Sequence, residues 1–273
     1  MRASEAWAFA TLMIGCTPSR PAAHPAEDAR PGAAPHPVVV LLRHSVWYGA
    51  VNAPLFIAYD DGRVLYPDSS EENVPITYAS AQLGVTGAEA VERTLGIDSA
   101  VLRLPRAYDL RPHVTDQQTV FLYVRAGDSL VRFSLRAAEV GPDQLSDSIP
   151  GPLRNAFHRL SAFQSANAAP WHSDSLYVHA WPYEYAPDNP PLAWPTTWPN
   201  LQSAGTERRR DETVGELITI RLPYADRAAL DSLLKLRRPQ QAIAISGKKW
   251  AVGYRTPFPA EAEWRSQFGR LEE

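Results

Sequence analysis

The chain has 273 residues, of which 45% are hydrophobic and 21% charged, the composition of an ordinary folded protein of one or two domains. The formal net charge of −3 provides no positive field for nucleic acid, so we expect no nucleic-acid partner. The single cysteine, Cys16, excludes a disulfide within the chain and a zinc site built on cysteines.

The first 16 residues have the order of a secretory signal. Arg2 precedes an apolar run over residues 6–14, and a small residue and then Cys16 follow it. The run is too short to span a bilayer, which needs about 20 residues. Residues 12–16 resemble the lipobox of bacterial lipoproteins, in which the cysteine is diacylated and becomes the new N-terminus.

That resemblance implies a signal peptide over residues 1–16 and a lipid on Cys16. The membrane would then be a partner through the lipid. The protein would lie in the bacterial cell envelope, at the outer membrane in a Gram-negative host. Two alternatives stay open: a secreted protein that is cleaved after its signal, and a buried N-terminal helix that is not a signal.

Residues 17–37 contain six prolines interleaved with alanine. Prolines at this density prevent the segment from forming a helix or pairing as a strand in a sheet. Such a segment is extended and semi-stiff, so we expect a tether that holds the following domain away from a membrane. Residues 38–273 are then expected to form a single globular domain. This domain could divide into two sub-lobes, over residues 38–165 and 171–264.

Two segments predict the clearest β-hairpins. In residues 54–66, β-prone runs meet at Asp61 and Gly62, a pair typical of a type I′ turn, in which both central residues have positive φ. In residues 119–136, apolar and polar residues alternate on both strands, which indicates a sheet with one solvated face. A closing hairpin is expected over residues 242–255.

Helices are expected between the hairpins. Thr86 and Glu89 have the spacing of a capping box, and Gly96 suits the left-handed end of the helix that they would open. Pro152 suits the first position of a second helix, and residues 224–236 carry a third helical pattern. The sequence therefore predicts an α+β fold of mostly antiparallel sheets built from hairpin-plus-helix units, with the helices packed on one side.

The first hairpin and the tail over residues 255–261 also carry a family resemblance. The pattern Pro-x-Phe-x-x-Tyr-x-Asp-Gly-x-Val resembles secreted and lipid-anchored proteins of high-GC bacteria with no known activity. The resemblance would span residues 38–264, and it implies the location and the fold but assigns no catalytic residue. In this chain the pattern stands at Pro54, Phe56, Tyr59, Asp61, Gly62 and Val64.

Motifs for common chemistry are missing from the sequence. It has no Gly-x-Ser-x-Gly, no His-Glu-x-x-His, no Walker loop and no dinucleotide-binding glycine pattern. We therefore favour a protein without catalysis and expect no metal and no cofactor. The alternative is an envelope hydrolase or metal-dependent enzyme that uses histidines among His44, His113 and His172, the last together with Asp174.

An aromatic, proline-rich segment is the candidate binding site. Trp181, Trp194 and Trp198 each precede a proline, so flat rings are carried on a stiff, extended chain. Such rings can stack on the sugars of an envelope glycan or dock a partner protein, although they can equally pack over a sheet.

The arginines 208–210 stand between Glu207 and Asp211 and are interpreted as part of a solvated loop over residues 207–212, with a phosphate clamp as the alternative. The sequence thus predicts a non-enzymatic, lipid-anchored envelope protein that binds a protein partner or a glycan.

Overall fold

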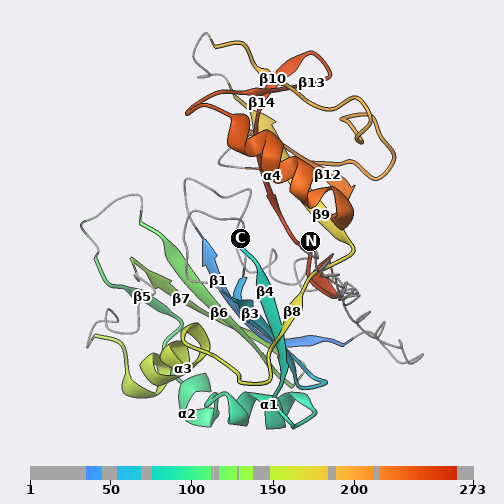
Figure 1. Cartoon of the computed structure of the whole chain (residues 1–273). Helices are drawn as coiled ribbons and strands as arrows, with labels where there is room; N and C mark the ends of the chain where they lie inside the picture. Colours follow the sequence, from blue (N-terminus) through green and yellow to red (C-terminus); the bar gives the residue numbers. More distant parts are fainter. Residues whose placement is uncertain are drawn as a thin grey trace, which may run out of the picture. The chain divides into compact units, whose positions relative to one another are not determined.

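The computed structural model describes the larger part of the chain. Its described ranges are residues 35–44, 54–68, 76–111, 113, 117–127, 129–137, 148–183, 189–211 and 215–262. The predicted signal peptide over 1–16, the lipidation site Cys16 and residues 17–34 of the predicted tether lie outside the described residues. The described residues form two sheets with accompanying helices (Figure 1), and the fold is α+β with mostly antiparallel sheets, as predicted.

The first sheet has eight strands in the order β5-β7-β6-β1-β2-β3-β4-β8. Its centre is β1, which pairs antiparallel with β2 on one side and β6 on the other. Residues 38–42 of β1 are buried on both faces, as their continuous apolar run predicts. The strands are β1 (Pro37–His44), β2 (Pro54–Tyr59), β3 (Arg63–Pro67), β4 (Tyr78–Gln82), β5 (Ala107–Asp109), β6 (Thr119–Ala126), β7 (Ser129–Arg136) and β8 (Ala169–Trp171).

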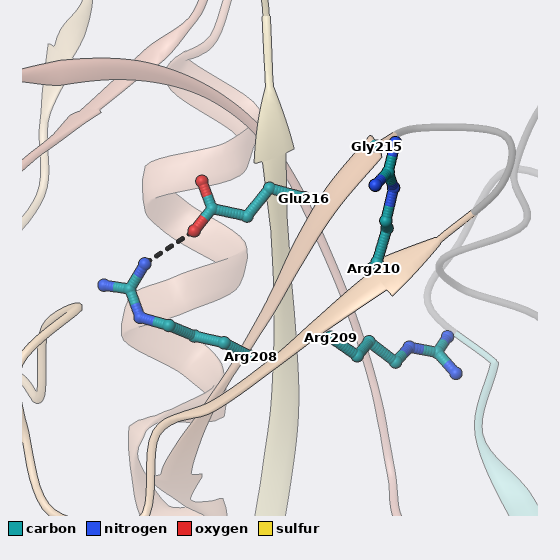
Figure 2. Close-up of a pocket in the computed structure, with 5 residues that line it drawn as sticks. All are labelled: Arg208, Arg209, Arg210, Gly215 and Glu216. Atoms are coloured by element: carbon teal, nitrogen blue, oxygen red, sulfur yellow. Dashed lines mark hydrogen bonds and ion pairs between the residues drawn. The ribbon is translucent and has the colours of Figure 1, made fainter.

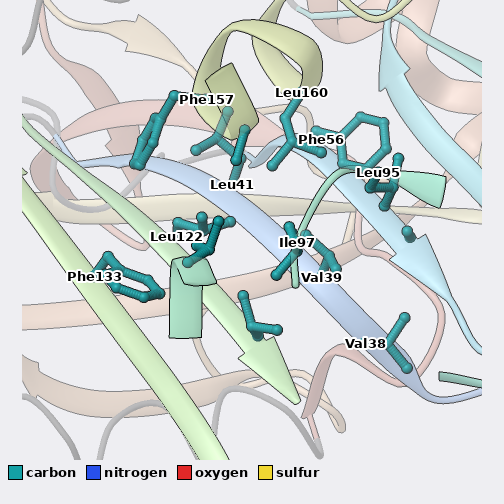
Figure 3. Packing of buried hydrophobic residues seen from close by; sticks show 14 of the residues in the cluster. Val38, Val39, Leu41, Phe56, Leu95, Ile97, Leu122, Phe133, Phe157 and Leu160 are labelled. Carbon is teal, nitrogen blue, oxygen red and sulfur yellow. The ribbon is translucent and has the colours of Figure 1, made fainter. Parts of the chain in front are cut away.

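Three helices cover one face of the first sheet (Figure 1). They are α1 (Ala88–Thr94), α2 (Ser99–Leu102) and α3 (Gly151–Ser161). Their apolar residues meet alternate residues of the strands in a buried cluster, the helix-side core (Figure 3). This core includes Val39, Leu41, Phe56, Val91, Leu95, Leu122, Phe133, Leu153, Phe157 and Leu160.

The opposite face of the same sheet is buried at its centre. Within the 119–136 hairpin, for which a solvated face was predicted, Tyr123 of β6 is buried on that face, whereas Arg132 and Ser134 of β7 are partly exposed and Arg136 is exposed. The predicted solvated face is therefore present on β7 and absent at Tyr123.

We call the buried residues on this face the tail-side cluster. Its cover includes Phe258, which follows the last strand of the chain and lies 4.8 Å from Tyr78 and 5.6 Å from Trp171 between ring centroids. The residues are Val40, Leu42, Ile57, Tyr59, Leu65, Tyr78, Tyr123 and Phe258.

The second sheet has six strands in the order β10-β13-β14-β9-β12-β11. The helix α4 (Arg227–Leu236), which follows the short 3-10 turn η2 (Tyr224–Asp226), contributes Leu230 to the second core. The strands are β9 (Ser175–Pro182), β10 (Leu192–Ala193), β11 (Glu207–Asp211), β12 (Gly215–Pro223), β13 (Ile243–Ile245) and β14 (Lys248–Arg255). The second core is Leu176, Val178, Ala180, Trp194, Leu201, Ile218, Ile220, Leu222, Leu230, Ile243, Ile245, Trp250, Val252 and Tyr254.

The turn of the first hairpin differs from the type I′ prediction. Gly62 has φ of 82° and its amide donates to the Tyr59 carbonyl at 3.0 Å, whereas Asp61 keeps a negative φ. The loop therefore has three residues and ends on a left-handed glycine. The type I′ signature is found at Ser246 and Gly247, whose φ angles are 50° and 77°.

The start of α1 also differs from the prediction. Gly87, not Thr86, is the N-cap residue, and no side chain caps the helix. The Gly87 amide instead donates to the Asp60 carbonyl at 2.6 Å, so the first hairpin fixes where the helix begins. The predicted end is confirmed, because Gly96 follows the helix with φ of 76°.

The charged segment that was predicted to be a loop is the strand β11. It pairs antiparallel with β12, and Arg208 lies opposite Ile218. Because β11 is an outer strand, the side chains of residues 207–210 stay exposed and the strand needs no apolar alternation. Backbone pairing with β12 therefore overrides the low strand propensity of its residues.

Candidate functional site

The structure brings together Trp194 and Trp198, two of the three tryptophans of the predicted binding segment. Trp194 is only 7% exposed, and its indole Nε1 donates to the Pro199 carbonyl at 2.9 Å. Trp198 is partly exposed and meets Trp194 edge to face, with ring centroids 5.0 Å apart and an angle of 72° between the rings. The buried ring thus supports one that reaches solvent.

The backbone around this pair is fixed to the second sheet. The Trp194 amide donates to the Ala244 carbonyl at 3.0 Å, which continues the parallel pairing of β10 with β13. The side chain of Gln241 donates to the Pro190 carbonyl at 2.6 Å, and the Trp198 amide donates to the Pro195 carbonyl at 3.1 Å. Backbone and side-chain bonds together hold the tryptophan pair in one place.

Trp181 lies apart from the pair. It belongs to β9, where Leu176, Val178 and Ala180 face the second core. Because successive strand residues point to opposite faces, Trp181 projects from the other face of the sheet, opposite Ala251 in the pairing of β9 with β14. It is partly exposed.

The histidines of the alternative enzyme hypothesis have different surroundings. The His44 ring lies 6.1 Å from Phe121, His113 is exposed, and His172 stacks on Tyr224 at 4.2 Å. Asp174 accepts the Tyr224 amide through its backbone carbonyl at 2.8 Å. Across the ranges that the structure describes, no group of three or more His, Cys, Asp or Glu is placed to hold a metal ion.

A polar network that sequence reasoning missed starts at His172. The ring of Tyr224 stacks on His172, and its hydroxyl accepts from Arg227 Nη1 at 2.8 Å. Arg227 Nε lies 3.7 Å from the Asp231 carboxylate, which also accepts a hydrogen bond from the Tyr254 hydroxyl. Burial, and then the bond to Asp231, raise the pKa of Tyr254 above its usual value.

This network fixes α4 to the second sheet rather than activating a nucleophile. Tyr254 stays protonated at neutral pH because both causes favour the neutral phenol. Arg227 and Asp231 come from α4, whereas Tyr254 comes from β14. Tyr224, Arg227 and Asp231 are neighbours in the sequence, but His172 and Tyr254 lie far from them, so no local pattern could have revealed the whole network.

The β11–β12 hairpin carries an open hollow of about 530 Å³, shown in Figure 2. Arg208 Nη1 lies 2.6 Å from the Glu216 carboxylate, and its Nη2 donates to the Leu201 carbonyl at 3.1 Å. Figure 2 shows that the side chains of Arg208 and Arg209 point to opposite sides of the hairpin. The arginines therefore do not converge on one point, as a phosphate clamp would require. The hollow is lined by Arg208, Arg209, Arg210, Gly215 and Glu216.

None of the helices in the described ranges has the length and apolar character needed to cross a bilayer. No protein-family model, no curated protein and no solved structure matches this chain.

Proposed function

We propose that this protein is a non-enzymatic, lipid-anchored protein of the cell envelope that binds an envelope glycan or a partner protein through Trp198, with Trp194 as its support. The observation that carries the proposal is the partly exposed Trp198 ring held against the buried Trp194 ring. A flat ring that is already fixed loses little conformational entropy on binding, so more of the contact energy appears as affinity. Stacking on a sugar or docking of a protein needs such a ring.

The anchoring part of the proposal is supported by the sequence. The lipobox resemblance ends at Cys16, and the proline-rich residues 17–37 would place the folded part away from the bilayer surface. Radiolabelled palmitate should be incorporated by the wild-type protein in its host and not by Cys16→Ala. A wild-type protein that takes up no label would refute the anchor.

We further propose that the folded part is one globular domain over residues 38–273 with two sub-lobes, built from hairpin-plus-helix units. Two observations support this arrangement. Each sheet is formed by a continuous part of the sequence, since β1–β8 make the first and β9–β14 the second. The β6–β7 hairpin is followed along the chain by α3.

The binding role is tested with Trp198→Ala and with isolated envelope glycan as the probe. The wild-type protein should co-sediment with peptidoglycan sacculi or with a purified envelope polysaccharide, and Trp198→Ala should bind at least about tenfold more weakly. Trp181→Ala is the control, because Trp181 lies on the other face of the sheet. Near-UV circular dichroism must show that both variants stay folded.

Two results would overturn this use of Trp198. One is a Trp198→Ala protein that binds glycan and envelope proteins as well as the wild type does. The other is a variant that fails to fold, which would show that the ring is needed only for packing.

A further inference from the structure

The outer strands of the two sheets differ in how much free backbone they offer. An edge strand presents unpaired N–H and C=O groups along one side. In the first sheet, β5 and β8 have three residues each, and β8 contains Pro170. In the second sheet, β10 has two residues and lies in a proline-rich segment, whereas β11 has five residues and no proline.

β11 is therefore the longest edge within the described ranges, and none of the described strands pairs with its outer side. Its central residues are three consecutive arginines, all exposed. Arg208 is partly neutralised by Glu216. Arg210 makes no hydrogen bond or ion pair with another described residue. Positive charge is thus concentrated at the middle of this edge.

The charges disfavour the fully overlapped antiparallel pairing of this edge with a second copy of itself. In an antiparallel pair centred on Arg209, Arg208 of one chain faces Arg210 of the other, and Glu207 faces Asp211. Like charges directly opposite each other destabilise a strand pair. Acidic side chains directly opposite the three arginines would instead stabilise a strand pair at this edge.

From this geometry we propose that the outer edge of β11 binds an extended acidic segment of a partner protein, which adds a strand to the second sheet. Backbone hydrogen bonds along the edge supply the affinity, and the arginines select acidic side chains. The partner's side chains alternate between faces as do those of β11. Those beside Arg208 and Arg210 lie on one face of the sheet, and the one beside Arg209 lies on the other.

This surface is separate from the one in the proposed function. The tryptophan pair follows β10, which lies at the opposite edge of the six-stranded sheet from β11. The two proposals can therefore fail independently. Trp198→Ala should leave binding at β11 unchanged.

The test uses the full chain and a fluorescent peptide with three central glutamates flanked by valine and threonine. Fluorescence anisotropy should show binding that weakens with salt, and hydrogen exchange should show new protection of β11 amides. A peptide with three central lysines, and a glutamate peptide with a central proline, should each bind at least about tenfold more weakly. The first tests charge and the second tests backbone pairing.

Variants of the protein make the test specific. Arg210→Glu should weaken the binding of the glutamate peptide about tenfold and strengthen the binding of the lysine peptide. Lys248→Glu is the matched control, because Lys248 is an exposed cation of β14 that lies away from the edge, and it should change neither affinity by more than about twofold.

Three results would overturn the proposal. They are the absence of binding at millimolar peptide, equal binding of the glutamate and lysine peptides, and protection that appears only on self-association. In the last case light scattering would show a dimer, and the edge would serve a second copy of the chain.

Discussion

Arg255 and Glu261 form a two-point ion pair, with Nη1 to Oε2 at 2.7 Å and Nη2 to Oε1 at 2.5 Å, and their side chains are only 8% and 3% exposed. The pair closes a short loop after β14. Glu261 Oε2 also accepts the Phe258 amide at 2.9 Å, which orients the ring that enters the tail-side cluster. The Tyr59 hydroxyl donates to the Pro259 carbonyl at 3.3 Å. The ion pair thus holds the end of the second sheet's last strand against the first sheet's residues.

Removal of one partner of this pair should be costly. Glu261→Gln or Glu261→Ala is expected to lower the free energy of unfolding by about 3–5 kcal/mol, because Arg255 would remain buried without its counter-charge. Urea denaturation of each variant measures this loss. The double variant Arg255→Met, Glu261→Leu should be more stable than either Glu261 variant, since no buried charge is left alone.

An exposed pair provides the control. Arg136 and Asp109 are 3.0 Å apart on the neighbouring strands β7 and β5 of the first sheet, with side chains 44% and 36% exposed. Asp109→Ala should cost no more than about 1 kcal/mol because solvent screens the attraction. Equal losses in the Glu261 and Asp109 variants would contradict the assigned role of burial.

Glu92 should make stability depend on pH. This carboxyl lies in α1 and is 6% exposed, and its Oε1 has no hydrogen-bond partner among the described residues. Burial, and to a smaller degree the charge of Glu89, raise the pKa of Glu92 from 4.5 to about 7. The folded state therefore binds the proton more tightly than the unfolded state does.

The sign of the effect follows from that difference. The contribution of Glu92 to stability is complete below pH 4.5 and is lost as the pH rises through 7. Glu92→Gln cannot ionise, so at pH 8 its free energy of unfolding should exceed that of the wild type by about 1–3 kcal/mol. This difference in free energy should become smaller as the pH falls toward 4. The exposed Glu207→Gln variant is the control. A Glu92→Gln effect that does not change with pH would refute the prediction.

Gly62 tests how tightly the first hairpin meets the segment before α1. Its φ is 82°, and a Cβ atom there would lie 2.0 Å from the backbone oxygen of Val85. Gly62→Ala should therefore cost more than the roughly 1–2 kcal/mol of a left-handed alanine alone. Gly247→Ala is the matched control, because Gly247 has φ of 77° with open space around it. If Gly62→Ala and Gly247→Ala have the same midpoint of urea denaturation, the close approach of Gly62 to Val85 would be contradicted.

The helix-side core could be predicted from the sequence because its residues repeat with the periods of the elements that carry them. Val120, Leu122 and Val124 alternate in β6, and Leu153 and Phe157 recur at helical spacing in α3. The tail-side cluster could not be predicted. Its cover at Tyr78 comes from Phe258, and no local pattern records a contact between residues so far apart.

The candidate surfaces were only partly predictable for a related reason. Tryptophans in a proline-rich segment fit both display and packing, and the structure shows both, with Trp194 buried and Trp198 partly exposed. At β11 the sequence was misleading, because an exposed edge strand can carry charges at every position. Its pairing with β12 depends on the partner strand and not on its own pattern.

Trp194 should prove to be the support for Trp198 and not a binding residue itself. Trp194→Ala removes a ring that is 7% exposed, so it should cost about 3–5 kcal/mol of unfolding free energy and release Trp198 from its place. Trp194→Phe keeps an aromatic ring but loses the hydrogen bond to the Pro199 carbonyl, and it should lower the free energy of unfolding by less.

The binding of glycan separates the two variants at a temperature where both are folded. Binding should survive in Trp194→Phe and weaken in Trp194→Ala. Time-resolved fluorescence anisotropy should detect faster motion of Trp198 in Trp194→Ala. The same measurement on a protein that carries Trp198→Phe gives the signal of the other tryptophans, against which the Trp198 signal is compared. Full binding by a folded Trp194→Ala protein would show that the buried ring does not position Trp198.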